Sequence, residues 1–443
     1  HSHEVFLCVQ TQGQMQDPDK VQFDSFEYYL KSRAEMSEAF AVFCPEIDRA
    51  TVRTILDNTL HVADQVSAQV VFAGPGAHLA APKLPPGVPD YDAWVKKLVV
   101  EGVRWRHQCG IGDLAQNYRD RIRMEFDRIS HSGFSAYFIL VWDIKREARA
   151  RGIFAGPGRG SGGGSSIAYY LGITDLDPLE YDLSFDRFLA PGRVDLPDFD
   201  LDFASSRRDE LFGYLQERYG HDHVASISTN SRMQGKMTLQ RVGRAYGVPA
   251  AETAGASALI VDALEAEARA KQSLVTSLEA SSIGREFMRR YPQVIEAAAA
   301  IEGNIFTAGR HPAGIVIGPK PLDELLPLES RKADDKTTKA ARRRMAVTAF
   351  DMAELEELGF VKIDALSLTA LDVVGYATEI IRARLDPTFD LLLVDRTDEA
   401  TLQAFTDHRF AGVFQYDTPS SRTLCRSYTF RSIDDVAVIT ALN

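Results

Sequence analysis

The chain has 443 residues, of which 45% are hydrophobic and 25% are charged. This composition is typical of globular proteins and excludes a disordered chain, a collagen-like repeat and a disulfide scaffold. The formal charge is −12, from 50 Lys and Arg against 62 Asp and Glu. Nucleic acid binding would therefore need local basic surface, or metal ions that bridge carboxylates to phosphates.

At about 100–200 residues per domain, the length predicts two to four domains. The four cysteines form no Cys-x-x-Cys pair, which argues against a zinc ribbon or a thioredoxin-type motif and favours a reducing, cytoplasmic compartment. No apolar run approaches the roughly 18 residues that span a bilayer, so we expect no membrane segment. Both ends of the chain look arbitrary, and we expect a fragment of a longer protein.

The first half of the chain predicts helices followed by a glycine-rich loop. A proline-rich stretch at residues 80–89 predicts a linker after a small leading segment. Apolar residues then recur at helical spacing over 91–151, which predicts two or three helices. The glycine-rich run at 156–166 leads into a short apolar helix at 167–171, and a strand is expected at 196–203.

The second half combines a helical insertion with further strands. Residues 229–305 are rich in alanine and have helical periodicity, which predicts a mostly helical insertion. Apolar β-branched residues at 314–317 and 360–363 predict strands on either side of a basic segment at 331–344. After residue 371 we expect helices that alternate with short strands.

The predicted strand at 196–203 alternates acidic and apolar side chains. The acidic residues are Asp198, Asp200 and Asp202, and the apolar residues are Phe199, Leu201 and Phe203. Because a strand sends alternate side chains to opposite faces, the three carboxylates share one face. A pair of divalent ions about 3.5–4 Å apart would balance them and is suited to phosphoryl transfer. An amphipathic strand with a solvated acidic face is the ordinary structural alternative.

The glycine-rich run allows two kinds of nucleotide site. It satisfies the pattern G-x-G-x-x-G at 158–163, but the apolar segment before it is short for the strand of a dinucleotide-binding fold. A phosphate cradle fits better, with glycine amides, the Ser161 hydroxyl, the charge of Arg159 and the dipole of the following helix. A flexible linker is the structural alternative, disfavoured because an apolar helix follows directly.

Four motifs in order carry a family resemblance. They are GFSAYF at 133–138, GPGRGS at 156–161, GITDLDP at 172–178 and PDFDLDF at 197–203. Together they resemble the bacterial C-family replicative DNA polymerases, and the resemblance covers nearly the whole chain. It implies an α/β (α+β) fold: a palm related to the DNA polymerase beta nucleotidyltransferases, with a helical thumb insertion and partial fingers.

The resemblance also implies a division into domains. A remnant of the polymerase-and-histidinol-phosphatase (PHP) domain, comprising its last strand and helix, is expected at 1–67. The remaining parts are the first part of the palm at 68–229, the thumb at 230–307, the second part of the palm at 308–370 and the start of the fingers at 371–443.

The family's site residues match positions in this chain. Its catalytic, metal-binding aspartates match Asp198, Asp200 and Asp364, with Asp202 as a further candidate on the same face. Its nucleotide-binding positions match Arg159, Gly160, Ser161, Arg187, Arg310, His311 and Lys362. The implied cofactor is Mg²⁺ in a two-metal site, with Mn²⁺ as a substitute.

Several of these residues have ordinary structural explanations. Lys362 could be a strand lysine that extends to solvent, and His311 could be a core or capping histidine. Arg187 could pair with Asp186 or Glu180 at the surface. The basic segment at 331–344 could be a solvated loop or could contact the DNA backbone.

The resemblance implies a template-directed DNA polymerase that binds primer–template DNA and a dNTP. The regions that bind the sliding clamp and other replicase subunits in this family are largely missing from the sequence. A template-independent nucleotidyltransferase of the same superfamily is one alternative. A non-catalytic module that binds DNA or another subunit is the other.

Overall fold

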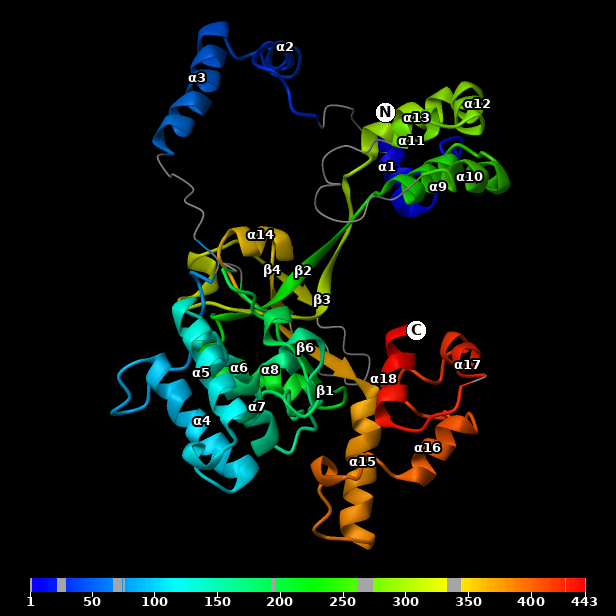
Figure 1. Ribbon diagram of the computed structural model, residues 1–443. Helices are drawn as coiled ribbons and strands as arrows, with labels where there is room; N and C mark the ends of the chain where they lie inside the picture. Colours follow the sequence, from blue (N-terminus) through cyan, green and yellow to red (C-terminus); the bar gives the residue numbers. More distant parts are fainter. Residues whose placement is uncertain are drawn as a thin grey trace. The chain divides into compact units, whose positions relative to one another are not determined.

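The chain forms two compact units. The computed structural model describes residues 2–21, 29–66, 74, 76–192, 196–260, 274–332, 344–426 and 428–442. One unit combines 1–71 with 230–309, and the other combines 72–229 with 310–443. Of the three points at which the chain passes from one unit to the other, two lie within long strands, β2 (Val224–Arg232) and β3 (Ile305–Ile317), which are neighbours in one sheet (Figure 1).

The first unit is built from helices. They are α1 (Ser2–Thr11), α2 (Arg33–Phe43), α3 (Arg49–Gln65), α9 (Gly235–Ala245), α10 (Ala250–Ser257), α11 (Leu274–Glu279), α12 (Ser282–Arg290) and α13 (Pro292–Ile301). Helix α1 packs against α9 and α13, and Val5, Cys8 and Val9 belong to the same buried core as Leu239 and Ala298. The mostly helical insertion predicted for 229–305 is confirmed in its described part.

A strand expected before residue 68 is not found among residues 2–21 and 29–66. The apolar run from Val5 to Val9 lies in α1, and its buried side chains pack onto other helices. The assignment of this segment to a PHP remnant stays a prediction.

The second unit contains the sheet and the remaining helices. Its further strands are β1 (Asp200–Ala204), β4 (Leu328–Lys332), β5 (Arg344–Thr348) and β6 (Lys362–Leu368). Its helices are α4 (Tyr91–His107), α5 (Gln116–His131), α6 (Ser135–Ala150), α7 (Ser166–Tyr170), α8 (Arg208–Tyr219), α14 (Met352–Glu357), α15 (Thr369–Arg384), α16 (Glu399–Thr406), α17 (Pro419–Cys425) and α18 (Ile433–Leu442). The prediction of two or three helices between residues 91 and 151 is confirmed, and the structure has three, α4, α5 and α6.

The sheet has the strand order β1-β6-β3-β2-β5-β4 and mixes parallel with antiparallel pairs. Strands β1 and β6 are parallel, whereas β6 and β3 are antiparallel. Strands β2 and β5 are parallel, and β5 pairs with β4 in the antiparallel direction. This mixed α/β architecture with helical insertions confirms the predicted fold class.

Alternating side chains bury both faces of the sheet. On β3, Ile315 and Ile317 belong to the core formed with α4, α6 and α7, while Val316 belongs to a second core with Leu322 and Leu355. This follows from the two-residue period of a strand. The face that carries Val316 also carries the site described below, because residues directly opposite in an antiparallel pair share a face.

Several elements have bounds that differ from the predicted ones. The strand expected at 196–203 begins at Asp200, and the strand expected at 314–317 is the end of the longer β3. The linker at 80–89 has no helix or strand, but Ala80 is buried in the core formed with α4, α6 and α7. Most of the basic segment, residues 333–343, lies outside the described residues, so its contact with DNA stays a prediction.

The strands expected after residue 371 are wrong for the described part, 371–426 and 428–442, which contains helices and turns. There the apolar residues instead gather into a small core around Phe410, Tyr416 and Phe430.

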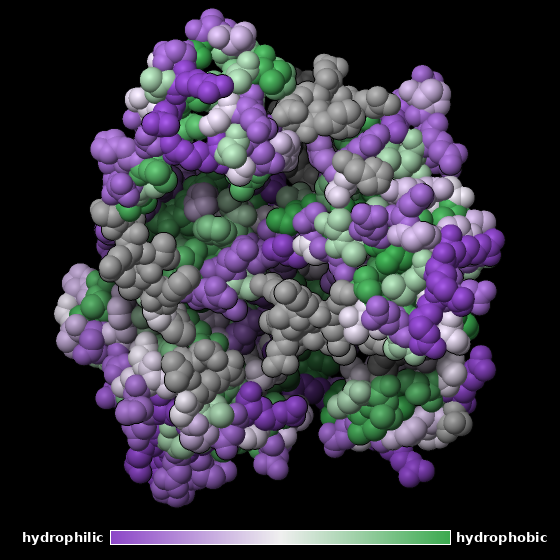
Figure 2. All heavy atoms as spheres, turned by 90° about the horizontal axis from the view of Figure 1, so that it is seen from above, coloured by the Kyte–Doolittle hydropathy of each residue, from purple (hydrophilic) through white to green (hydrophobic). Residues whose placement is uncertain are grey.

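No described helix is both long and apolar enough to cross a membrane. The face seen in Figure 2 is mostly hydrophilic, with smaller hydrophobic patches between.

Candidate metal and phosphate site

Three aspartates meet where β1 and β6 run side by side. The parallel register places Asp200 opposite Asp364, and Asp198 lies two residues before Asp200. Each of the three offers a carboxylate oxygen, and these oxygens lie within 4.8 Å of one another. On the opposite face of β1, Leu201 and Phe203 are buried in the core. The strand alternation thus separates an acidic face from a packed one, as the sequence predicts.

Lys362 supplies positive charge to this triad of Asp198, Asp200 and Asp364. Its Nζ lies 2.7 Å from Oδ2 of Asp364. Burial alone would lower the pKa of Lys362, but the hydrogen bond and charge of Asp364 together with Asp198 raise it above its ordinary value. The pKa of Asp198 is raised by burial and then by the negative charge of Asp364. Lys362 is therefore an ion-pair partner in the site and not a lysine that extends to solvent.

The triad has the donors that a divalent cation needs. Oδ1 of Asp364 is buried and accepts no hydrogen bond from any described residue. A buried carboxylate oxygen is costly unless it is hydrogen-bonded, paired or bound to a metal. Carboxylate oxygens are also the ligands that Mg²⁺ prefers. The residues present therefore fit a hard divalent cation.

Asp202 stands apart from the triad. Its Oδ2 lies 3.7 Å from Nε of Arg159, and its Oδ1 is buried without a hydrogen-bond partner in the described part of the chain. Burial raises the pKa of Asp202, and Arg159 opposes that effect. Asp202 is not among the three residues whose carboxylate oxygens come together.

The glycine-rich loop lies directly on the acidic strand. Arg159 places Nη2 3.6 Å from Oδ1 of Asp200. Gly160 has a φ of +64°, and a Cβ at this position would lie 3.1 Å from Oδ2 of Asp200. A side chain would thus be strained and would crowd the carboxylate, so glycine fits here. Ser161, next in the loop, is exposed.

The amides that begin α7 are not available to a phosphate. Ser166 N and Ile167 N donate to the carboxylate of Glu125, at 2.9 and 3.0 Å, and Ala168 N donates to Ser165 Oγ at 3.1 Å. The expectation that this helix dipole helps to hold a phosphate is therefore wrong. A protein carboxylate already occupies the position, which leaves the exposed part of the loop at 159–161.

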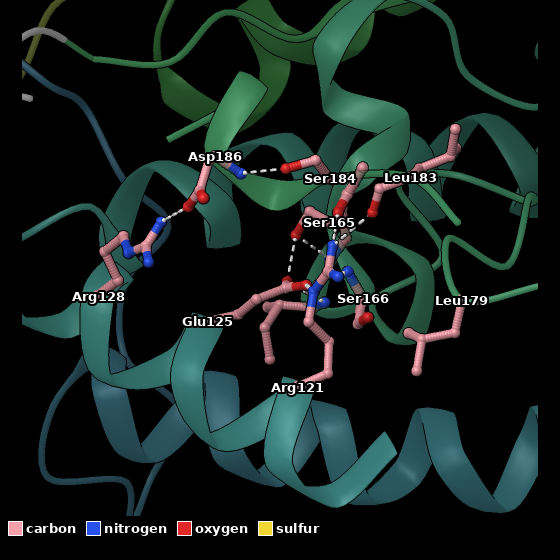
Figure 3. A network of polar contacts seen from close by, with 12 residues as sticks. Arg121, Glu125, Arg128, Ser165, Ser166, Leu179, Leu183, Ser184 and Asp186 are labelled. Carbon is pink, nitrogen blue, oxygen red and sulfur yellow. Dashed lines mark hydrogen bonds and ion pairs between the residues drawn. The ribbon is translucent and has the colours of Figure 1, made fainter. Parts of the chain in front are cut away.

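Glu125 and Arg121 of α5 form hydrogen bonds with the C-terminal end of the glycine-rich loop, residues 164–166 (Figure 3). Arg121 Nε donates to Glu125 Oε1 at 2.6 Å, and Nη2 donates to the carbonyls of Gly164 and Leu183 at 2.6 and 2.8 Å. Burial raises the pKa of the Glu125 carboxyl. A Cβ on Gly164 would lie 2.5 Å from the carbonyl oxygen of Ser184, so this glycine permits a close backbone approach. The glycine run is packed in place at this end.

His311 and Arg310 lie on β3, the strand that pairs with β6, and of the two only His311 has an electrostatic interaction with Asp364. Nδ1 of His311 accepts hydrogen bonds from the amides of Ala313 and Gly314, at 3.2 and 2.6 Å. Burial lowers the pKa of His311, against an opposing effect of Asp364. These contacts fit the capping histidine that the sequence allowed, because the ring nitrogen accepts hydrogen bonds from two nearby backbone amides. Arg310 lies with Nη1 3.5 Å from the sulfur of Met345.

Arg187 is exposed on the short 3₁₀ turn Phe185–Arg187, and no contact joins it to the triad. The surface pairing with Asp186 is not found, because Asp186 pairs with Arg128 instead. A nucleotide-binding role for Arg187 stays a prediction.

Sequence reasoning missed two residues that support the acidic strands. The Tyr137 hydroxyl accepts a hydrogen bond from Phe199 N at 3.2 Å, next to Asp198. Arg208 Nε donates to the carbonyl of Ala365 at 2.7 Å, next to Asp364. The strand pattern gave no signal for either, because both lie on other elements and contact the backbone just before β1 or within β6. Tyr137, Asp198 and Lys362 also line a pocket of about 340 Å³.

Comparisons with known proteins identify the family. Residues 93–367 match the model of the bacterial DNA polymerase III alpha NTPase domain, and residues 370–443 match that of the alpha subunit finger domain. The chain therefore belongs to the bacterial DNA polymerase III alpha subunit family, which confirms the resemblance seen in the sequence.

Curated relatives named DNA polymerase III subunit alpha match along all of this chain. The protein of Mycobacterium tuberculosis is 34% identical over 455 residues, that of Xylella fastidiosa 32% over 456 and that of Borreliella burgdorferi 32% over 444. In each case the chain spans 36% of the relative's length.

Proposed function

We propose that this chain carries the nucleotidyl-transfer centre of a template-directed DNA polymerase. The observation that supports this most directly is the triad, whose carboxylate oxygens lie within 4.8 Å of one another. One buried oxygen of Asp364 has no hydrogen-bond donor among the described residues. Its substrates would be a dNTP and the 3′-hydroxyl of a primer paired to template DNA. The family membership supports the same activity.

In this proposal Asp198, Asp200 and Asp364 would hold divalent cations, Mg²⁺ in the cell with Mn²⁺ as a substitute. Such ions supply Lewis-acid stabilisation of the phosphoryl oxygens and a lowered pKa of the attacking hydroxyl. The side chains set the position of these charges. Lys362 reduces the repulsion between the carboxylates, and Asp202, which faces Arg159, contributes to the field of the site.

The loop residues Arg159, Gly160 and Ser161 would bind the triphosphate through a guanidinium, a backbone amide and a hydroxyl. Arg159 lies within 4 Å of two carboxylates, so it is already held at the edge of the acidic face. Lys362 and Arg310 add positive charge for the departing pyrophosphate. His311 and Arg187 remain candidates for the border of the nucleotide site.

Domain roles, partners and location belong to the same proposal. We infer a palm at 68–229 and 308–370, a thumb at 230–307 and fingers from 371, with a PHP remnant at 1–67. A cytoplasmic replicase with a sliding clamp and further subunits would be the setting of the complete protein.

Nucleotide binding by the 443-residue chain tests the proposal. In calorimetry, dATP should bind in millimolar Mg²⁺ and not in EDTA. Asp200→Ala should lower the affinity for dATP by at least roughly tenfold, because the metal loses a ligand. Asp127→Ala, which removes an exposed carboxylate of α5, is the matched control and should bind like the wild type. Absence of metal-dependent binding by the wild type would favour a non-catalytic module.

Primer extension separates the enzymatic alternatives. Extension that requires a template and is lost in Asp200→Ala supports the polymerase, whereas extension retained in that variant contradicts the catalytic assignment. Addition of nucleotides without a template would indicate a template-independent nucleotidyltransferase.

A further inference from the structure

Lys145 on α6 is a buried lysine with no role in the site described so far. Its side chain is 1% exposed, and its Nζ donates a hydrogen bond to the carbonyl oxygen of Gly156 at 2.8 Å. Lysine is almost never fully buried unless it is paired, because its ammonium group loses hydration. Its position inside the core of the unit therefore needs a local reason.

The Gly156 backbone joins this lysine to the acidic strand. Gly156 N donates to the carbonyl of Asp202 at 2.9 Å, and Ala155 forms a bridge with Phe203. A Cβ on Gly156 would lie 3.0 Å from Cβ of Asp202, so the two backbones approach closely. Gly156 is thus held from one side by β1 and from the other by Lys145, and Arg159 follows three residues later.

The charges around Lys145 are nearly balanced without it. Asp175 pairs with Arg106 at 2.7 Å and with Arg149 at 2.9 Å. Burial lowers the pKa of Lys145 to about 8, Asp175 and Asp202 act against burial, and Arg149 and Arg106 act with it. Near neutral pH the ammonium form therefore persists beside the Asp202 end of the acidic face.

We propose that Lys145 is a positioning residue for the phosphate-binding loop: its ammonium group fixes the Gly156 carbonyl so that Arg159, Gly160 and Ser161 lie against the acidic strand. An apolar side chain of similar length would fill the same space without the cost of a buried charge. What the lysine adds is a donor for a buried carbonyl at the start of the loop. The link to phosphate rests on the proposed function, whereas the fixing of the loop does not.

Lys145→Met in the 443-residue chain tests this, because methionine is unbranched and only one atom shorter than lysine and removes the donor and the charge. Hydrogen–deuterium exchange of peptides that cover 156–164 should become at least about fivefold faster, while peptides from α4 keep the wild-type rate. The Kd for dATP in Mg²⁺ should rise roughly tenfold. The matched control is Lys97→Met on α4, an exposed lysine, which should change neither measurement.

Each outcome decides a separate point. Unchanged exchange of 156–164 in Lys145→Met would overturn the positioning role, whether or not the wild type binds dATP. Faster exchange with unchanged dATP affinity would overturn the link to phosphate binding. If the wild type binds no dATP, the proposed function fails while exchange still tests Lys145. Lys145→Gln serves as a second variant, and loss of the native circular dichroism in both variants would overturn a role confined to the loop.

Discussion

At the scale of single residues, the site combines opposing electrostatic effects. Three carboxylate oxygens lie within 4.8 Å, and Lys362 forms an ion pair with one of these groups, Asp364. Loss of hydration and the charge of Asp364 raise the pKa of Asp198, so its ionised form is less favoured in the folded chain without a metal than in the unfolded chain. A cluster of carboxylates that could hold a cation is therefore a source of instability when no cation is bound.

Asp198→Asn should raise the melting temperature of the metal-free chain at pH 7. The sign follows from linkage: a carboxyl whose pKa is raised by folding binds its proton more tightly in the folded state. The stability that Asp198 contributes therefore increases as the pH falls through its raised pKa. This gain is complete once the pH is below the pKa of an aspartate in the unfolded chain, about 3.9. The advantage of the variant should shrink accordingly as the pH is lowered from 7 towards 4.

Scanning calorimetry in EDTA measures this difference, with Asp127→Asn as the exposed control. Addition of Mg²⁺ should then stabilise the wild type more than Asp198→Asn, since binding to the folded state adds to stability. A lower melting temperature for Asp198→Asn at pH 7 would contradict the electrostatic account.

Some of these residues could be predicted from the sequence and others could not. Asp198, Asp200 and Asp202 were visible because strand alternation needs only neighbouring positions. Asp364 depended on the family resemblance, since the register that pairs it with Asp200 involves a distant strand. Lys145 was concealed among basic residues at the end of a helix, where a solvated position is the ordinary expectation.

At the scale of elements, the glycine-rich loop at 156–166 depends on α5. Glu125 accepts from Ser165 Oγ at 2.9 Å and from the first amides of α7, and Arg121 joins this carboxylate to the loop carbonyls. The interaction spans 40 residues between Glu125 and Ser165. A glutamate in a charged helix gives no sign of such a partner, so the sequence predicted a free helix end where the structure has an occupied one.

Glu125→Gln should lower the free energy of unfolding by about 3 kcal/mol, because an amide group replaces a buried acceptor that faces two backbone N–H groups and an arginine. Urea denaturation at pH 7 measures the loss. Glu101→Gln on α4, which alters an exposed glutamate, should stay within about 0.5 kcal/mol of the wild type. A loss for Glu125→Gln as small as that of the control would show that the network contributes little.

Element lengths were harder to predict than element types. The apolar run at 314–317 marked a strand, but β3 begins at Ile305. None of the first eight residues of this strand is buried, so no alternating apolar pattern marks its beginning. The segment after residue 371 has apolar residues that a strand could also use. There the apolar side chains pack into an aromatic core around Phe410 and Tyr416, and the backbone forms helices and turns. These tertiary contacts override the local preference of the sequence.

At the scale of the whole molecule, each unit is assembled from separate stretches of the chain. The sequence divides naturally into consecutive segments, and the family resemblance predicts that the leading segment is a separate PHP remnant. In the structure α1 completes the core of the helices at 235–301, because Val5, Cys8 and Val9 are buried there. Periodicity identifies an apolar helix face but not the helices that cover it. The net charge of −12 similarly says little about the site, where acids and basic residues are arranged locally.

Val5→Ala should therefore loosen one unit and leave the other unchanged. Val5 is 0% exposed, and removal of two buried methyl groups together with the resulting cavity should cost about 2 kcal/mol. Hydrogen exchange should become faster in α9 and α13, which share its core, whereas α4 and α6 belong to a different core and should keep the wild-type rate. Val42→Ala on α2, where the valine is 70% exposed, provides the matched control. Equal acceleration in α6 would mean that the two units unfold together, and their separate cores would then not act as separate cooperative units.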